Sequence, residues 1–202
     1  MFQKILKIFN IKLDSNQKWI FTSLFISGFL ITYISPIFMK TVITLLPAEW
    51  IAFENLFIAL SALIIGMIWK GKVREKALKY FISFCVIQSL LGFGLALYLA
   101  FIDFNVWVYA IFSLIYTSLI TIFVGKCIMV FKTKLWNEEK RENYDNNSEI
   151  IGSLTCILGF LCALLFMPSL KVALVLYGLC CVIDDIGWIV VYSKNKKLLK
   201  TI

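Results

Sequence analysis

The residues of this chain with the clearest chemical potential are two adjacent carboxylates, Asp184 and Asp185. They lie in the last apolar segment, residues 172–193, about thirteen residues from its start. At a rise of about 1.5 Å per residue, a helix would carry them roughly 18–20 Å into a bilayer, close to its centre. An ionisable residue at that depth costs free energy unless it faces a bundle interior, a partner or water. The pair is therefore a candidate functional site.

Adjacent helical residues point about 100° apart, so the two carboxylates cannot face the same neighbour. One can line a cavity or a dimer interface while the other pairs with a neighbouring helix. Two close carboxylates in a poor dielectric favour the neutral acid for at least one of them, as a proton-coupling site needs. We predict that Asp184 and Asp185 couple a proton or another cation. The alternative is a shifted segment with both acids at the inner interface beside Lys194.

Six further residues inside apolar segments are candidate substrate contacts, and each has a structural alternative. An acid near the outer boundary can simply be interfacial. A mid-helix amide can form a helix–helix hydrogen bond, hydroxyls can bond to their own helix carbonyls, and aromatic rings can pack. The candidates are Glu54, Asn55, Gln88, Tyr116, Thr117 and Trp188.

The composition places the chain in the membrane class, with 61% hydrophobic and 16% charged residues. The chain contains no histidine, which removes Ser-His-Asp and Cys-His catalysis, haem ligation by His and His-ligated metal sites. Its six cysteines all fall within apolar segments without Cys-x-x-Cys spacing, as buried packing residues do. We therefore expect no metal, no cofactor and no enzyme activity.

The apolar segments predict an all-α integral membrane protein. A six-helix transmembrane domain is expected over 19–193, with an amphipathic interfacial segment at 1–18, a cytoplasmic loop at 132–149 and a basic cytoplasmic tail at 194–202. The chain starts with Met and has basic residues at both ends, so we expect it to be complete. The predicted spans are 19–39, 50–69, 80–102, 106–131, 150–168 and 172–193.

The Lys and Arg residues predict the orientation of these spans. Eighteen of the 20 fall on one side, in the N-terminal segment, the loops after the second and fourth spans and the tail. Only Lys40 and Lys171 fall on the other side. The positive-inside rule therefore predicts a multi-pass protein of the cell membrane with both termini in the cytoplasm. The same distribution explains the net charge of +8 by membrane orientation and excludes a nucleic-acid partner.

Small or short polar residues recur at helical spacing in three of the segments. Such stripes let helix backbones approach closely, which drives helix association in lipid. They predict a compact bundle among membrane lipids. The stripes are Asn55, Ala59, Ala62 and Gly66; Cys85, Ser89, Gly92 and Ala96; and Gly152, Cys156, Gly159 and Ala163.

The layout resembles one half of a major facilitator superfamily transporter, over residues 19–193. The shared features are six spans, both ends inside, a short basic loop after the second span and a longer charged loop after the fourth. In the first of these loops, Gly66 and Arg74 match the family's signature, whereas Lys70 stands at its acidic position. The resemblance implies a possible 3+3 inverted repeat and a gating loop at Gly66 and Arg74.

A lone half would lack the facing half that closes a central cavity, so the resemblance implies a homodimer. Our first hypothesis is a proton- or cation-coupled secondary transporter of an unidentified small molecule. The second is a non-catalytic membrane subunit, such as an immunity or assembly protein, in which the acids join helices. The third, a membrane enzyme, lacks support: Cys181-Val182-Ile183-Asp184 replaces the Gly-x-Gly-Asp of intramembrane aspartyl proteases, and Gly-x-Ser-x-Gly and Walker motifs are absent.

Overall fold

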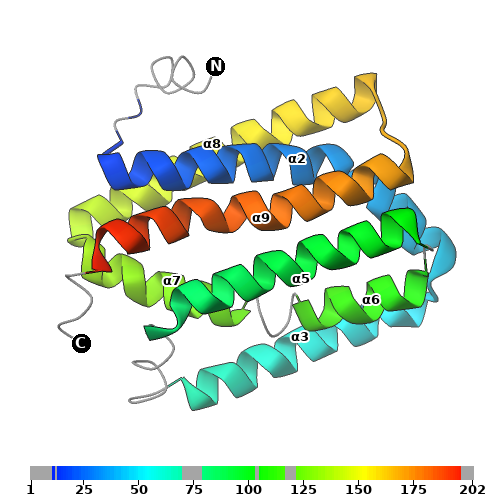
Figure 1. The fold of residues 1–202 in the computed structure, drawn as a ribbon, viewed down its shortest axis with the longest axis horizontal. Helices are drawn as coiled ribbons and strands as arrows, with labels where there is room; N and C mark the ends of the chain where they lie inside the picture. Colours follow the sequence, from blue (N-terminus) through cyan, green and yellow to red (C-terminus); the bar gives the residue numbers. More distant parts are fainter. Residues whose placement is uncertain (1–10, 12, 70–78, 103–104, 117–121, 197–202) are drawn as a thin grey trace.

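The computed structural model describes residues 11, 13–69, 79–102, 105–116 and 122–196 of the 202. Every secondary-structure element in this described part is a helix (Figure 1). The all-α prediction is therefore confirmed for these residues. The helices are α2 (Ser15–Leu45), α3 (Ala48–Ile68), α5 (Phe81–Phe101), α6 (Val106–Ile115), α7 (Ile122–Leu135), α8 (Glu138–Leu165) and α9 (Leu170–Lys194).

Five of these helices, α2, α3, α5, α8 and α9, are long and apolar enough to cross a membrane. They correspond to five of the six predicted spans. The sixth, predicted as one helix over 106–131, is described as the 10-residue α6 and the 14-residue α7. Each is too short to span a bilayer alone. Residues 1–10 and 12 of the amphipathic segment predicted at 1–18, and most of the basic tail, lie outside the described residues. The last residues of that segment belong to α2, which begins at Ser15.

The stretch 132–149, predicted as a cytoplasmic loop, is mostly helical. α7 runs to Leu135 and α8 already begins at Glu138. The Asn137 side chain caps α8 by accepting a hydrogen bond from the Lys140 backbone N–H at 3.1 Å, and two acidic residues occupy the first turn. Capping and acids at the positive end of the helix dipole stabilise this start, although the sequence there is strongly polar.

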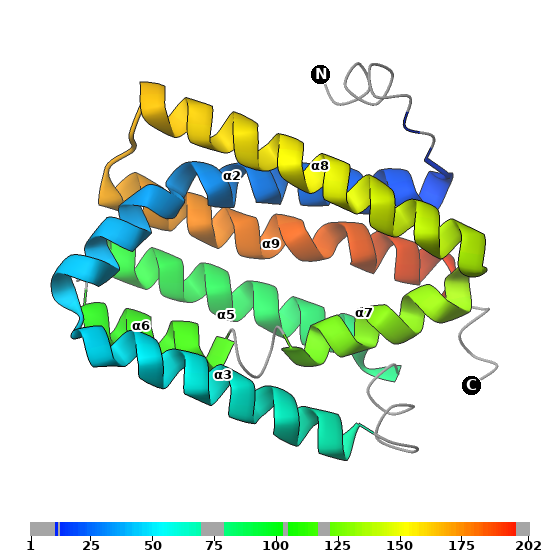
Figure 2. The same ribbon diagram turned by 180° about the vertical axis from the view of Figure 1, so that it is seen from behind.

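α9 is the central helix of the molecule. It packs against α2 on one side and α5 on the other, and α2 packs in turn against α8 (Figures 1 and 2). Glycines allow close backbone approaches to α2: a Cβ added to Gly187 of α9 would lie 2.8 Å from the Ile20 Cα, and one added to Gly159 of α8 would lie 2.9 Å from the Phe29 carbonyl oxygen. α3 and α6 lie side by side beyond α5, whereas α7 runs from near α5 to the start of α8 (Figure 2).

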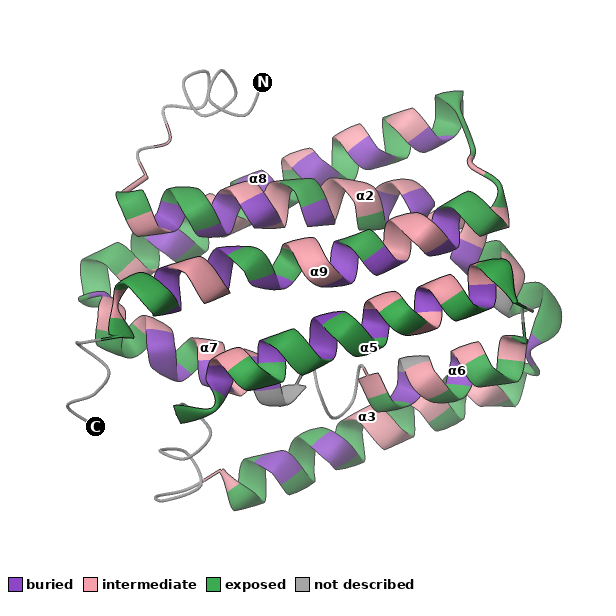
Figure 3. Cartoon of the chain, in the orientation of Figure 1, coloured by how far each residue is buried: buried purple, intermediate pink, exposed green. Residues whose placement is uncertain are grey.

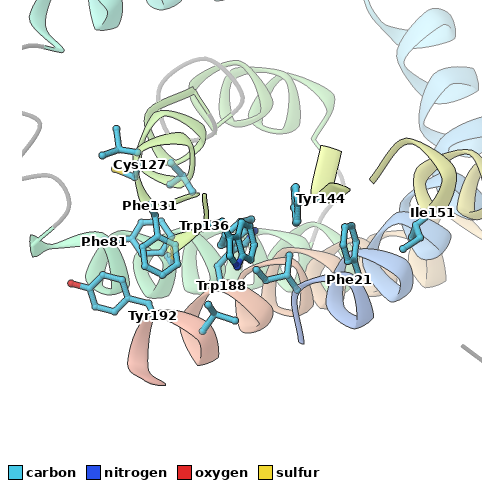
Figure 4. Packing of buried hydrophobic residues seen from close by; sticks show 14 residues of the cluster. Phe21, Phe81, Cys127, Phe131, Trp136, Tyr144, Ile151, Trp188 and Tyr192 are labelled. Atoms are coloured by element: carbon cyan, nitrogen blue, oxygen red, sulfur yellow. The ribbon is translucent and has the colours of Figure 1, made fainter. Parts of the chain in front are cut away.

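An aromatic cluster holds one end of the bundle together (Figure 4). Trp188 of α9 packs edge-on against Phe131 of α7, with ring centroids 6.1 Å apart. Tyr144 of α8 stacks on Trp136 at 5.1 Å and on Phe21 of α2 at 4.8 Å. The polar start of α8 is thus fixed by Tyr144, whose ring is buried among three helices.

The three predicted small-residue stripes have different outcomes. The α5 stripe is confirmed, since all four of its residues are buried. In α8 only Gly159 and Ala163 of the predicted stripe are buried. In the first half of the stripe, the buried residues are Ile151 and Thr155, each one position before the predicted residue. The prediction that the α3 stripe packs against other helices of the same chain is wrong. α3 buries Ser61 and Ile65 and leaves all four stripe residues exposed (Figure 3).

Candidate functional site

The two carboxylates lie in the middle of α9, a 25-residue helix. Ser169 caps the start of this helix, since its hydroxyl accepts a hydrogen bond from the Val172 backbone N–H. Asp184 is ten residues from Lys194, about 15 Å along the axis. Lys194 lies over the Trp19 ring, 5.0 Å from its centroid, at the start of α2. The acids are therefore well separated from the basic end of α9.

Asp185 is sealed between α9 and α5. Only 2% of its surface is exposed, although it carries a carboxylate. The Ser89 hydroxyl of α5 donates a hydrogen bond to Asp185 Oδ2 at 2.8 Å and also lies 3.2 Å from the Cys181 carbonyl oxygen. A buried acid with such a partner ties the two helices together.

Asp184 points away from Asp185, toward α2. The Ser27 hydroxyl of α2 donates a hydrogen bond to Asp184 Oδ1 at 3.0 Å. Unlike Asp185, the Asp184 side chain is exposed, because it lines a pocket of about 250 Å³ between α2 and α9. Tyr116, the residue after α6, completes the lining. One acid therefore faces a space that a solute can enter and the other does not.

A third polar residue, Gln88, reaches the same region from α5. Its Nε2 donates a hydrogen bond to the Tyr116 hydroxyl at 3.1 Å, and the Gln88 side chain is 5% exposed. Its Oε1 has no hydrogen-bond partner within the part of the chain that the structure describes. Gln88 thus holds the Tyr116 phenol in place beside the pocket.

The structure brings together four of the predicted site residues, Asp184, Asp185, Gln88 and Tyr116. Trp188 belongs instead to the aromatic cluster and is 4% exposed (Figure 4). Three other candidates lie away from the pocket on α3: Glu54, Asn55 and Gly66. Thr117 and Arg74 fall outside the described residues.

Two serines and a tyrosine complete the site without having been predicted as site residues. Ser27 and Ser89 each donate to one carboxylate, and Tyr177 lines the pocket one and a half to two turns before Asp184. Ser89 carried a signal, since it belongs to the small-residue stripe of α5. Ser27 carried none, because it is 157 residues away from the acid that it meets.

The arrangement can exchange a proton between Asp184 and the pocket, and it can hold a positively charged solute beside the ionised carboxylate. It offers little to a metal ion, since the described residues contain no group of three His, Cys, Asp or Glu side chains that could bind one. The chemistry of the site is that of one accessible acid in an otherwise uncharged pocket.

Fold and site define an all-helical protein with five helices that could cross a membrane and an acidic pair at the middle of the central one. Searches against protein-family models, curated proteins and solved structures find no match for the chain. The resemblance to the major facilitator superfamily therefore stays a prediction.

Proposed function

We propose that this chain is a multi-pass protein of the cell membrane that acts as a proton- or cation-coupled secondary transporter. Support for the membrane comes from its surface: large apolar side chains are exposed along all five long helices. Soluble monomers rarely expose continuous apolar surface on this scale. A lipid environment makes the exposure favourable.

One observation carries the transport proposal, namely the different surroundings of the two acids. Asp184 opens on a pocket of about 250 Å³, whereas the adjacent Asp185 is 2% exposed. An acid whose only role is to join helices has no need of a pocket. An accessible carboxylate midway along an apolar helix can bind and release a proton or a cation as the pocket changes access.

A transport screen tests the proposal directly. The purified protein is reconstituted in liposomes, a pH gradient is imposed, and a mixture of small metabolites is offered outside. We expect at least one solute to accumulate in the presence of the gradient and not after the gradient is collapsed by an ionophore. Accumulation no greater than in protein-free liposomes, across cationic, neutral and anionic solutes, would remove the transporter proposal.

The proposed orientation places both termini and residues 132–149 in the cytoplasm, following the positive-inside rule. Single cysteines introduced at Gln3, Asn146 and Thr201, in a variant without the six native cysteines, are expected to resist an impermeant thiol reagent added to intact cells. A cysteine introduced beside Lys171 is expected to react. If any of the first three reacts in intact cells, the six-span topology is wrong.

The proposed homodimer agrees with the exposed stripe of α3. Its four residues are exposed, and small residues at this spacing let a helix of a second copy approach closely. We expect two-step photobleaching of single labelled complexes in lipid. The Ala62→Trp variant should block the dimer contact, so that most complexes bleach in one step. Leu63→Trp, beside the stripe on the same helix, should still bleach in two steps. Fully active monomers would contradict the dimer.

The second candidate function, a non-catalytic subunit, is favoured by the Ser89–Asp185 hydrogen bond. That bond joins α5 to α9 with almost no exposure, as expected of a purely structural polar contact. In this alternative the acids stabilise the bundle and no solute crosses. The liposome screen separates the two, because only a transporter accumulates a solute.

A further inference from the structure

The pocket beside Asp184 has features that specify the kind of solute it accepts. Its walls are formed by one face of α2 and one face of α9, with Tyr116 at the end of α6. Its volume of about 250 Å³ lies below the roughly 300–1,000 Å³ of pockets that hold drug-sized ligands. The occupant is therefore a small molecule.

The charge of the lining excludes anions. Asp184 is an acid, and none of the described residues that form the pocket is a Lys or an Arg. An anion would meet a carboxylate with no compensating cation in a poor dielectric, which disfavours its binding. A cation gains an opposite charge and the hydroxyl of Ser27 beside it.

The rest of the lining selects an organic cation over a bare ion. A small inorganic cation needs about six oxygen ligands to replace its water. The walls instead present Leu24 and Ile31 of α2 and the rings of Tyr116 and Tyr177. Aromatic faces attract ammonium groups by cation–π interaction, and apolar walls receive their carbon substituents.

Both rings are held in position by other parts of the bundle. Tyr177 lies edge-on to Phe38 of α2, with ring centroids 5.6 Å apart. Tyr116 stacks on Phe112, one turn earlier, at 5.4 Å, and its hydroxyl accepts the hydrogen bond from Gln88. A preorganised aromatic wall loses little conformational entropy when a ligand binds.

We propose that this pocket binds a small organic ammonium ion, with Asp184 as its counter-ion and Tyr116 and Tyr177 as its aromatic walls. The role of this ion as transported substrate rests on the proposed function, whereas its binding rests on the pocket alone. Since the ammonium group and a proton both need the same carboxylate, the two compete for it. Transport by this site is exchange of the cation for a proton.

The titratable groups around Asp184 do not compete with it for the ammonium ion, so the ammonium ion and the proton compete at the Asp184 carboxylate. Besides Asp185, the titratable side chains of the described residues that interact with it or line its pocket are thiols and phenols, which are uncharged at neutral pH. Three of them, Cys180, Cys181 and Tyr177, belong to α9 itself. The others are Cys85 of α5, Tyr144 of α8 and Tyr116 after α6.

Equilibrium binding of radiolabelled benzyltrimethylammonium to the detergent-purified protein tests the proposal. We expect saturable binding that is tighter at alkaline than at acidic pH. Two probes with the same benzyl group serve as controls: neopentylbenzene, the neutral carbon isostere of the ammonium ion, and phenylacetate, an anion. Both are expected to compete at least about tenfold more weakly. Equal competition by the neutral isostere would overturn the proposal.

Variants assign the binding to this pocket. Asp184→Asn should lose affinity by at least about tenfold, and Tyr177→Leu should weaken binding while Tyr177→Phe preserves it. Glu49→Gln, on α3 and outside the pocket, should bind as the wild type does. Full affinity in Asp184→Asn would overturn the proposal. If the Asp184→Asn variant does not fold, the Tyr177→Leu variant decides: affinity for the ammonium ion equal to that of the wild type would overturn the proposal.

The two proposals fail in different ways. If the ammonium ion binds but no solute accumulates in liposomes, the binding site stands and the transporter does not. If a neutral or anionic solute accumulates while the ammonium ion does not bind, the transporter stands and this inference is wrong.

Discussion

The Asp184→Asn variant is expected to fold and insert normally and yet to lose pH-driven transport. The amide oxygen of the new side chain can still accept the hydrogen bond from Ser27, now 3.0 Å from Asp184 Oδ1, so the contact between α2 and α9 persists. The amide cannot ionise, so the pocket permanently resembles its protonated form. Uptake in liposomes should fall to the level of protein-free liposomes.

Asp185→Asn is the matched comparison, since it makes the same change one residue further along. Asp185 is sealed against Ser89 and does not line the pocket, so this variant should keep solute binding even where the rate of transport falls. Size-exclusion chromatography and the thermal unfolding midpoint show whether both variants fold. If both transport with the pH profile of the wild type, the carboxylates are structural.

The second large effect is expected at Gly159, where α8 touches α2. A Cβ there would lie 2.7 Å from the Thr32 Cβ, 2.9 Å from the Phe29 carbonyl oxygen and 3.0 Å from the Tyr33 backbone nitrogen. Backbone atoms cannot move aside cheaply, so Gly159→Ala should destabilise the fold by about 1–3 kcal/mol. The measurement is the thermal unfolding midpoint in detergent, followed by tryptophan fluorescence.

Gly152 provides the control on the same helix. A Cβ added there has no neighbour within 4 Å, and alanine is favoured over glycine in a helix by roughly 0.5–1 kcal/mol. Gly152→Ala should therefore be neutral or slightly stabilising. Equal midpoints for the two variants would mean that α8 does not pack on α2 through Gly159.

The central part of the structure could be predicted from local patterns in the sequence. The predicted segment 172–193 corresponds to α9, Leu170–Lys194, and helical geometry alone required its two acids to face different neighbours. The buried stripe of α5 followed from spacing, because α5 packs closely along its whole length against α9.

The failures occur where local composition and tertiary contacts disagree. The stretch after α7 was read as a loop from its charges, but charged residues are good helix formers, and Tyr144 anchors them to the aromatic cluster. The α3 stripe has the same spacing as that of α5, and nothing local shows that Ser61 and Ile65 are the residues that α3 buries. The pairing of Ser27 with Asp184 depends on α2 meeting α9, which only the fold determines.

The most direct test of the account is whether Asp184 exchanges a proton when a solute moves. Liposomes are loaded with a pH-sensitive dye, the membrane potential is clamped, and the solute found to accumulate is added outside. With the wild-type protein we predict that the lumen becomes more alkaline as the solute enters, and that Asp184→Asn shows neither change. Entry of the solute at the wild-type rate with no change in lumenal pH would contradict the account.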